Sequence, residues 1–261
     1  MSEMIDYCTI VTDKRELELL PLHINSLKHY AGDEFNIKIC VPIDAEITEF
    51  CYKYCNDYVI VRTYTQMLHN PGLRQAGFDC ANRMDKLMQV CTSDWVFLSQ
   101  SDIIWTGNPL SKIKSMMNDN YGMLGIWPHG CTVVNRKVYK TCHHAFWPNG
   151  GWLGRVHSEN PMMIQLCGNT EGADQVWWNR NSPPGSNQKL VNIDGVDVGM
   201  LLPMEMQGYG YLFDRAGPVS SYVHIGGASF HGLTDTPGDE VIKKVISNRI
   251  KDALLKFKRF A

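Results

Sequence analysis

The chain has 261 residues, of which 44% are hydrophobic and 20% charged, and its formal net charge is −2. This is ordinary globular composition, and it excludes a disordered, collagen-like or coiled-coil chain. The near balance of acidic and basic residues gives no sign of a nucleic-acid-binding protein. Because no linker or low-complexity tract interrupts the sequence, we expect a single domain over residues 1–261.

Nine cysteines are scattered along the chain, several of them inside apolar runs. Their odd number and the lack of a Cys-X-X-Cys pair favour reduced thiols in a cytosolic protein, with oxidised pairs as the alternative. The N-terminus lacks the basic and apolar regions of a signal peptide, and no apolar run approaches the length of a membrane-spanning helix. We therefore expect a cytoplasmic protein.

The first half of the chain alternates short apolar segments with amphipathic segments of helical period. Strands are predicted at 7–12, 36–42, 58–63 and 94–99, and helices at 16–30, 48–56 and 79–90. This alternation predicts an α/β fold with a mostly parallel sheet flanked by helices. In such sheets, ligands bind at the carboxyl ends of the strands.

The second half has short strand-like segments at 122–127 and 131–135, then a stretch at 146–187 rich in Gly, Pro, Asn and Trp. Long irregular segments inside a compact domain are usually functional. Residues 241–259 have the pattern of a basic amphipathic helix. Such a helix either docks on an anionic membrane or packs on the domain with its basic face in solvent, and we favour the second arrangement.

The first segment with candidate functional residues is DWVFLSQSDIIW at 94–105. A buried strand there runs into Gln100, Ser101 and Asp102, so these polar side chains are expected at the carboxyl edge of the sheet. A carboxylate in that place is a suitable ligand for Mg²⁺ or Mn²⁺. The alternative is that Asp102 only turns the backbone.

Two later segments carry further candidates. In GADQVWWN at 172–179, Asp174 lies in the first turn of a predicted helix, where it either stabilises the helix start or serves as a catalytic or acceptor-binding carboxylate. In YVHIGGASFH at 222–231, a short strand leads through His224 into a Gly-Gly loop, whose backbone can approach a phosphate closely. His224 is either a metal ligand or a structural residue.

Together these segments resemble the nucleotide-sugar glycosyltransferases of the GT-A fold, in particular the glycogenin-like and lipopolysaccharide galactosyltransferase-like enzymes. YCTIVTD at 7–13 is similar to the family's first strand and uridine-side loop, and SQSDIIW at 99–105 resembles its DSDIIV-type Asp-X-Asp segment. DQVWWN at 174–179 is similar to the DQDVLN segment, and HIGG at 224–227 matches the late His-X-X-Gly. The resemblance covers residues 5–232 in the expected order.

The resemblance implies a Rossmann-like sheet with a nucleotide-sugar half at 1–105, an acceptor half at 106–232 and a C-terminal helix at 233–261. It implies transfer of a sugar from a nucleotide diphosphate sugar, UDP by default, to a glycan, lipid-linked or other hydroxyl acceptor. Mn²⁺ or Mg²⁺ would assist, held by Asp102 and His224, with Asp174 as the catalytic carboxylate. The sequence does not decide between a retaining and an inverting reaction, and the resemblance of the DQVWWN segment favours retention.

The remaining implied contacts fall into two groups. Residues implied to bind the nucleotide sugar are Thr12, Asp13, Arg62, Arg83, Lys86, Gln100, Ser101, Asp102, Gly226 and Gly227. Residues implied to bind the acceptor are Trp127, Trp152 and Gln175. Arg83 and Lys86 lie three residues apart on a predicted helix, and they either reach the diphosphate or are solvated charges.

The sequence departs from the family motif at Gln100, where the first Asp is expected. An amide is a poorer metal ligand than a carboxylate, so metal binding either depends on Asp102, His224 and the substrate phosphates or is weak or absent. The alternatives are a non-catalytic nucleotide-sugar or glycan-binding relative and another α/β metal-dependent enzyme such as a nucleotidyltransferase. A further alternative is an interaction protein that acts mainly through its basic tail.

Overall fold

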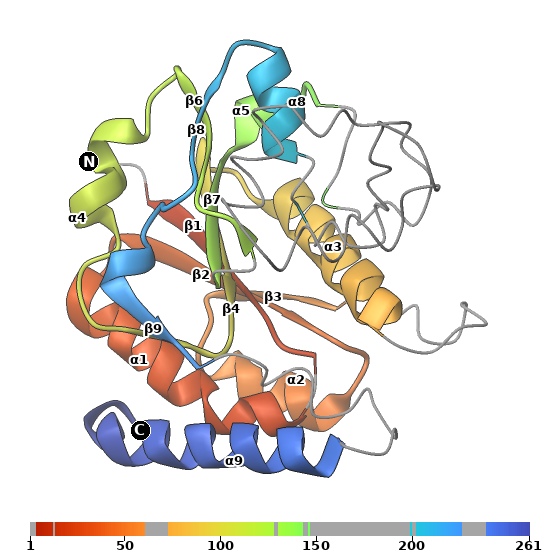
Figure 1. Ribbon diagram of the computed structural model, residues 1–261, viewed down its shortest axis with the longest axis vertical. Helices are drawn as coiled ribbons and strands as arrows, with labels where there is room; N and C mark the ends of the chain where they lie inside the picture. Colours follow the sequence, from red (N-terminus) through yellow and green to blue (C-terminus); the bar gives the residue numbers. More distant parts are fainter. Residues whose placement is uncertain are drawn as a thin grey trace, which may run out of the picture.

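The computed structural model describes residues 4–12, 14–60, 73–127, 130–142, 146, 199, 202–225 and 239–261. Within these residues, the centre is a seven-stranded sheet in the order β3-β2-β1-β4-β7-β6-β8 (Figure 1). Its strands are β1 (Ile5–Ile10), β2 (Phe35–Val41), β3 (Asp57–Ile60), β4 (Trp95–Gln100), β6 (Tyr121–Leu124), β7 (Cys131–Asn135) and β8 (Leu212–Asp214). Only the pairs made by β7 are antiparallel, so the predicted mostly parallel α/β sheet is confirmed.

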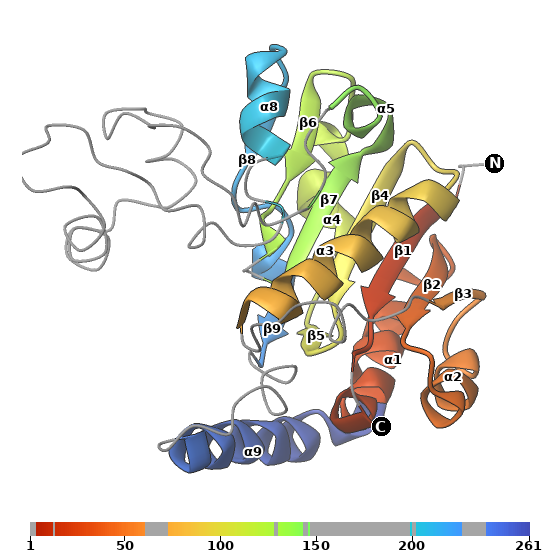
Figure 2. The ribbon, with the colours of Figure 1, turned by 90° about the vertical axis from the view of Figure 1, so that its right-hand side faces the viewer.

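Helices cover both faces of this sheet (Figure 2). On one face, α3 (Leu73–Val90) packs in a core cluster with Cys8 and Ile10 of β1. On the other, α1 (Leu20–Ala31) and α2 (Ala45–Tyr52) pack in a cluster with Tyr7. Because neighbouring residues of a strand point to opposite faces, the central strand is buried on both sides, as its apolar sequence predicts.

The predicted helix at 16–30 is divided in the structure. A 3₁₀ turn, η1 (Lys14–Glu18), precedes α1, and Pro21 lies in the first turn of α1. Proline lacks a backbone N–H and crowds the preceding turn, so it is accommodated at a helix start and not in its interior. The helix ends at Gly32, which has φ +60° and donates its N–H to the carbonyl of Lys28.

A second, two-stranded sheet carries part of the candidate site. β5 (Ile103–Trp105) pairs antiparallel with β9 (Tyr222–His224), and Ile103 lies opposite His224. The chain therefore brings together two segments about 120 residues apart in sequence. Asp102 and His224 become neighbours through this pairing.

Short elements complete the described chain. They are α4 (Leu110–Ile113), η3 (Lys114–Met116), α5 (Arg136–Tyr139), α8 (Leu202–Gly208), η6 (Val219–Ser221) and η8 (Lys258–Phe260). The C-terminal helix α9 (Asp239–Lys256) lies at an outer edge of the molecule, and its C-terminal end leads into η8, which packs beside α1 (Figures 1 and 2). It buries Ile246, Ile250, Ala253 and Phe257 against the domain, so the predicted packing of its apolar side is confirmed, and this packing leaves the basic side free to meet a further surface. Among the described residues, no helix is both long and apolar enough to cross a membrane.

Candidate functional site

The candidate site lies at the carboxyl edge of the sheet, where β1 and β4 end side by side. Ile10, the last residue of β1, is in register with Gln100, the last residue of β4. Thr12 follows β1, and Ser101 and Asp102 follow β4. Parallel strands end at the same edge, so residues distant in sequence gather there.

Three potential ligand atoms converge at this edge. His224 Nε2 lies 3.1 Å from Gln100 Oε1 and 3.3 Å from Asp102 Oδ1. The Asp102 side chain is 5% exposed and the His224 side chain 25% exposed. The Gln100 amide donates from Nε2 to the Trp127 carbonyl at 2.8 Å, which directs Oε1 towards His224. We call these three residues the Gln100–Asp102–His224 cluster.

Gly130 makes room for the cluster. Its φ is +104°, and a Cβ atom there would lie 2.6 Å from Ile103 Cγ2 and 3.3 Å from His224 Cγ. Its carbonyl accepts a hydrogen bond from Gln100 N at 2.8 Å. Only glycine adopts this backbone conformation and close approach without strain. Gly130 therefore allows β4, β5 and the His224 ring to pack closely together at this point.

The donor set of the cluster fits a divalent cation. Ligands about 2.1 Å from an octahedral ion lie about 3 Å from one another, close to the spacings observed here. A carboxylate oxygen, an amide oxygen and an imidazole nitrogen are ligands that Mg²⁺ or Mn²⁺ accepts. The described residues contain no group of three His, Cys, Asp or Glu side chains that could hold a metal, and the third donor of this cluster is instead an amide.

Glu16 belongs to the site although its sequence context gave no reason to choose it. Its carboxylate is buried and accepts hydrogen bonds from the backbone N–H of Thr12 at 3.0 Å and from the hydroxyls of Thr12 and Ser101. It thereby joins the loop after β1 to the segment after β4. Burial raises the Glu16 pKa and the charge of Asp102 adds to the rise, while the hydrogen bonds oppose it.

The two cations predicted on α3 have different surroundings. Arg83 is 1% exposed, and its Nη1 donates to the Val11 carbonyl at 2.7 Å, directly after β1. Its Nε has no acceptor within the described part of the chain. Lys86 is exposed and donates to Gln89 Oε1 at 3.2 Å. The structure therefore brings Arg83 to the carboxyl edge and leaves Lys86 on the outer face of the helix.

Trp127, for which the resemblance implies an acceptor contact, has its ring turned away from the surface. Its ring is buried in the core cluster that also holds Met84 and Phe146, and only its backbone carbonyl reaches the site. The other predicted site residues, Asp13, Arg62, Trp152, Asp174, Gln175, Gly226 and Gly227, lie outside the described residues.

A buried hydrogen-bond chain supports β5 from behind. Trp105 Nε1 donates to the Tyr7 hydroxyl oxygen at 3.0 Å. The Tyr7 hydroxyl in turn donates its proton to His23 Nε2 at 3.1 Å. The other His23 nitrogen, Nδ1, then donates to the Ile103 carbonyl at 2.7 Å. This chain is complete only with a neutral imidazole. Burial accordingly lowers the pKa of His23 to about 4.

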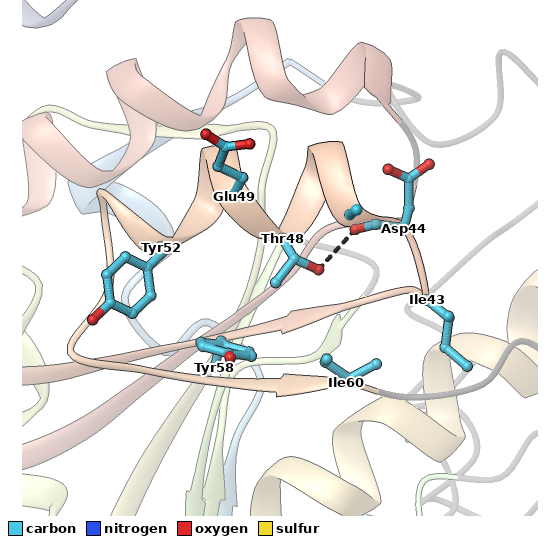
Figure 3. Close-up of a pocket in the computed structure, with 8 residues that line it drawn as sticks. Ile43, Asp44, Thr48, Glu49, Tyr52, Tyr58 and Ile60 are labelled. Carbon is cyan, nitrogen blue, oxygen red and sulfur yellow. Dashed lines mark hydrogen bonds between the residues drawn. The ribbon is translucent and has the colours of Figure 1, made fainter.

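A separate groove of about 510 Å³ lies between α2 and the edge strand β3 (Figure 3). Tyr58 and Ile60 point into it from β3, and Thr48 and Tyr52 face them from α2. Asp44, at the start of α2, lies 3.9 Å from Lys14 Nζ of η1. The groove therefore borders η1, the short turn that carries Glu16. The Gln100–Asp102–His224 cluster lies on the other side of β1, at the end of β4.

No protein-family model matches the sequence, and no curated protein matches it. Solved structures with a similar fold include an active-site mutant of LgtC, at 10% identity and TM-score 0.43, covering 93% of this chain and 83% of that chain. A Drosophila β1,4-galactosyltransferase 7 mutant in complex with manganese, UDP-Gal and xylobiose has 11% identity and TM-score 0.41, covering 93% of this chain and 80% of that chain.

Other similar structures align over shorter stretches. The bifunctional glycosyltransferase WbbM has 12% identity and TM-score 0.36, with 52% of this chain matched to 32% of that chain. The chain thus spans only about a third of WbbM. With TM-scores below 0.5, these likenesses assign no family or activity to the chain.

Proposed function

We propose that the protein is a glycosyltransferase that moves a sugar from a nucleotide diphosphate sugar to a hydroxyl group of an acceptor. The observation that carries the proposal is the convergence of Gln100, Asp102 and His224 at the carboxyl edge of β4. Open α/β sheets bind nucleotides at this edge. UDP is the expected donor nucleotide, and the acceptor is a glycan, a lipid-linked sugar or another hydroxyl compound.

A divalent cation, Mn²⁺ or Mg²⁺, is part of this proposal. Asp102, His224 and the amide oxygen of Gln100 would hold it, and the ion would neutralise negative charge on the leaving diphosphate. Because Gln100 carries no charge, we expect the ion to bind more tightly when the diphosphate is present and supplies further oxygen ligands.

The chain's own residues prepare the edge for an anionic substrate. Glu16 holds Thr12 and Ser101 together, so the backbone after β1 and the backbone after β4 keep a constant separation. Arg83 places a buried guanidinium beside the carbonyl of Val11, where it would add positive potential for a bound diphosphate. Neither side chain is itself proposed to react.

Thermal shift measurements with nucleotides and divalent metals test the proposal without knowledge of the acceptor. A ligand that binds only the folded state raises its melting temperature, so UDP or a UDP-sugar should stabilise the wild type, and Mn²⁺ should increase the shift. In Asp102→Asn, the manganese-dependent part of the shift should disappear, and donor turnover should fall about a hundredfold.

Asp119→Asn is the matched control, because Asp119 is exposed and the chemical change is the same. It should keep both the shift and the turnover. A manganese-dependent shift that survives in Asp102→Asn would refute the metal role. A wild-type protein that responds to no nucleotide diphosphate or nucleotide sugar would refute the proposal as a whole.

Gln100 favours one alternative, a nucleotide-sugar-binding protein without catalysis. Replacing a carboxylate by an amide leaves the site with less negative charge for a metal. Such a protein would show the same nucleotide-dependent stabilisation but neither sugar transfer nor slow hydrolysis of the donor. Chromatography of a UDP-sugar incubated with the protein separates the two, since only the enzyme releases UDP.

A further inference from the structure

The outward face of the C-terminal segment is a concentrated patch of positive charge. Residues 244–261 carry six exposed basic side chains and one acidic side chain, Asp252. The basic residues are Lys244, Arg249, Lys251, Lys256, Lys258 and Arg259. The segment therefore has a net charge of +5 in a chain of net charge −2, which leaves −7 on the remainder.

These six cations lack acidic partners within the described part of the chain. None of them takes part in a described ion pair. Arg259 donates to the uncharged Tyr30 hydroxyl at 3.0 Å and lies over the Phe260 ring. Like charges gathered on one helix repel each other, so an anionic partner on this face would relieve the repulsion.

Apolar side chains occur on the same face as the cations. The regular apolar stripe of α9, including Ile246, Ile250 and Phe257, is already packed on the domain. Leu255 is nevertheless 72% exposed, four residues after Lys251 and three before Lys258. Lys251 and Leu255 share one side of α9 at this spacing, so the exposed leucine lies beside a lysine, and Lys258 follows in the 3₁₀ turn η8.

We propose that this basic face binds the surface of a bilayer that contains anionic lipids, with Leu255 entering the headgroup region. Basic residues are attracted to anionic headgroups, and a leucine gains free energy at the boundary with the acyl chains. A nucleic acid backbone would satisfy the cations but would give Leu255 no apolar contact. The helix lies at the outer edge of the molecule, where a flat surface can reach it (Figures 1 and 2).

Docking through α9 would hold the candidate site near the lipid surface. Ile104 of β5 and Ile225, which follows His224, pack in the same apolar cluster as Ile246 and Ile250 of α9. β5, which begins directly after Asp102, and Ile225, which follows His224, thus pack in one apolar cluster with this helix. A lipid-linked acceptor would be presented close to the site, a consequence that depends on the proposed function, whereas the docking itself does not.

Co-sedimentation of the full chain with vesicles tests the docking. The wild type should bind vesicles of phosphatidylcholine and phosphatidylserine, bind pure phosphatidylcholine weakly, and be released by salt. Each basic residue near an anionic surface raises the partition coefficient about fivefold, so the triple variant Lys244→Gln, Lys251→Gln, Lys258→Gln should bind about a hundredfold more weakly. Leu255→Ser should weaken binding with the lysines intact.

The control is the triple variant Lys112→Gln, Lys114→Gln, Lys140→Gln, which removes three exposed lysines elsewhere on the surface. It should bind vesicles as the wild type does, and the melting temperatures of all variants show that they are folded. The proposal is overturned if the two triple variants bind vesicles equally well, or if the wild type binds vesicles with and without phosphatidylserine equally well. It is likewise overturned if the wild type binds RNA or DNA through Lys244, Lys251 and Lys258 but does not bind vesicles.

Discussion

Glu16 shows how one buried side chain connects loops that come from different strands. Its carboxylate is surrounded by three donors, two on Thr12 and one on Ser101, and it is nearly inaccessible to solvent. A buried acceptor with satisfied donors stabilises little by itself, but removing it leaves those donors without partners. Glu16 is therefore expected to matter for both the fold and the site.

Glu16→Ala should lower the free energy of unfolding by about 1–3 kcal/mol, the cost of leaving buried donors unsatisfied. It should also weaken UDP binding, because the loop after β1 is no longer held against Ser101. Urea denaturation and titration calorimetry measure the two effects. Glu18→Ala is the control, since Glu18 lies exposed in the same 3₁₀ turn. Loss of stability with unchanged UDP affinity would mean that Glu16 serves the fold alone.

The sequence pointed to Gln100, Asp102 and His224 by their residue types and by their places beside apolar strand-like segments. It did not point to Glu16, because a glutamate in the charged run KRELE is typical of an exposed helix start. The resemblance implied an acceptor contact for Trp127, but its ring packs in the core. Residue type predicts which groups can react, and burial decides which of them face the site.

At the scale of elements, the starts of two helices followed from single residues. Asp44 accepts hydrogen bonds from the N–H groups of Glu46 and Ile47, so α2 begins at Ala45, three residues earlier than the apolar period suggested. Pro21 likewise moved the start of α1. The pairing of β5 with β9 had no local signal, because it joins segments on either side of a long intervening stretch.

Gly130→Ala tests whether this pairing depends on one close approach. An added Cβ would meet Ile103 and the His224 ring, and the backbone at φ +104° disfavours any side chain. We expect a loss of about 2–4 kcal/mol in stability, from strain and from overpacking together. The manganese-dependent shift with UDP should also decrease. Gly107→Ala, where a Cβ would have no neighbour within 4 Å, should leave the stability and the manganese-dependent shift unchanged. If Gly130→Ala and Gly107→Ala change both quantities equally, the close approach of Gly130 to Ile103 and His224 is unimportant.

At the scale of the whole molecule, the His23 chain joins β1, α1 and β5 and makes global stability depend on pH. The folded protein keeps His23 neutral down to about pH 4, whereas an unfolded histidine takes up a proton near pH 6.5. The stabilisation is therefore complete above pH 6.5 and is lost as the pH falls towards 4. The expected loss from this residue is about 1.4 kcal/mol per pH unit over that window.

Urea denaturation at several pH values between 7 and 4 measures this dependence. His23→Gln should be less stable than the wild type at pH 7 but should show a shallower fall in stability on acidification. His29→Gln, which replaces an exposed histidine on the same helix, should keep the wild-type slope. If His23→Gln and the wild type have the same slope, another group is responsible for the pH dependence.

The sequence by itself determined the α/β class, the order of the first strands and helices, and the chemical types gathered at the strand ends. These follow from apolar periodicity and from single residues such as Gly32, which act within a few neighbours. Only the tertiary structure decided that His224 lies against Asp102 and Gln100, that Glu16 joins two loops, and that α9 turns its cations outward. Those outcomes depend on contacts between distant segments, which local pattern does not encode.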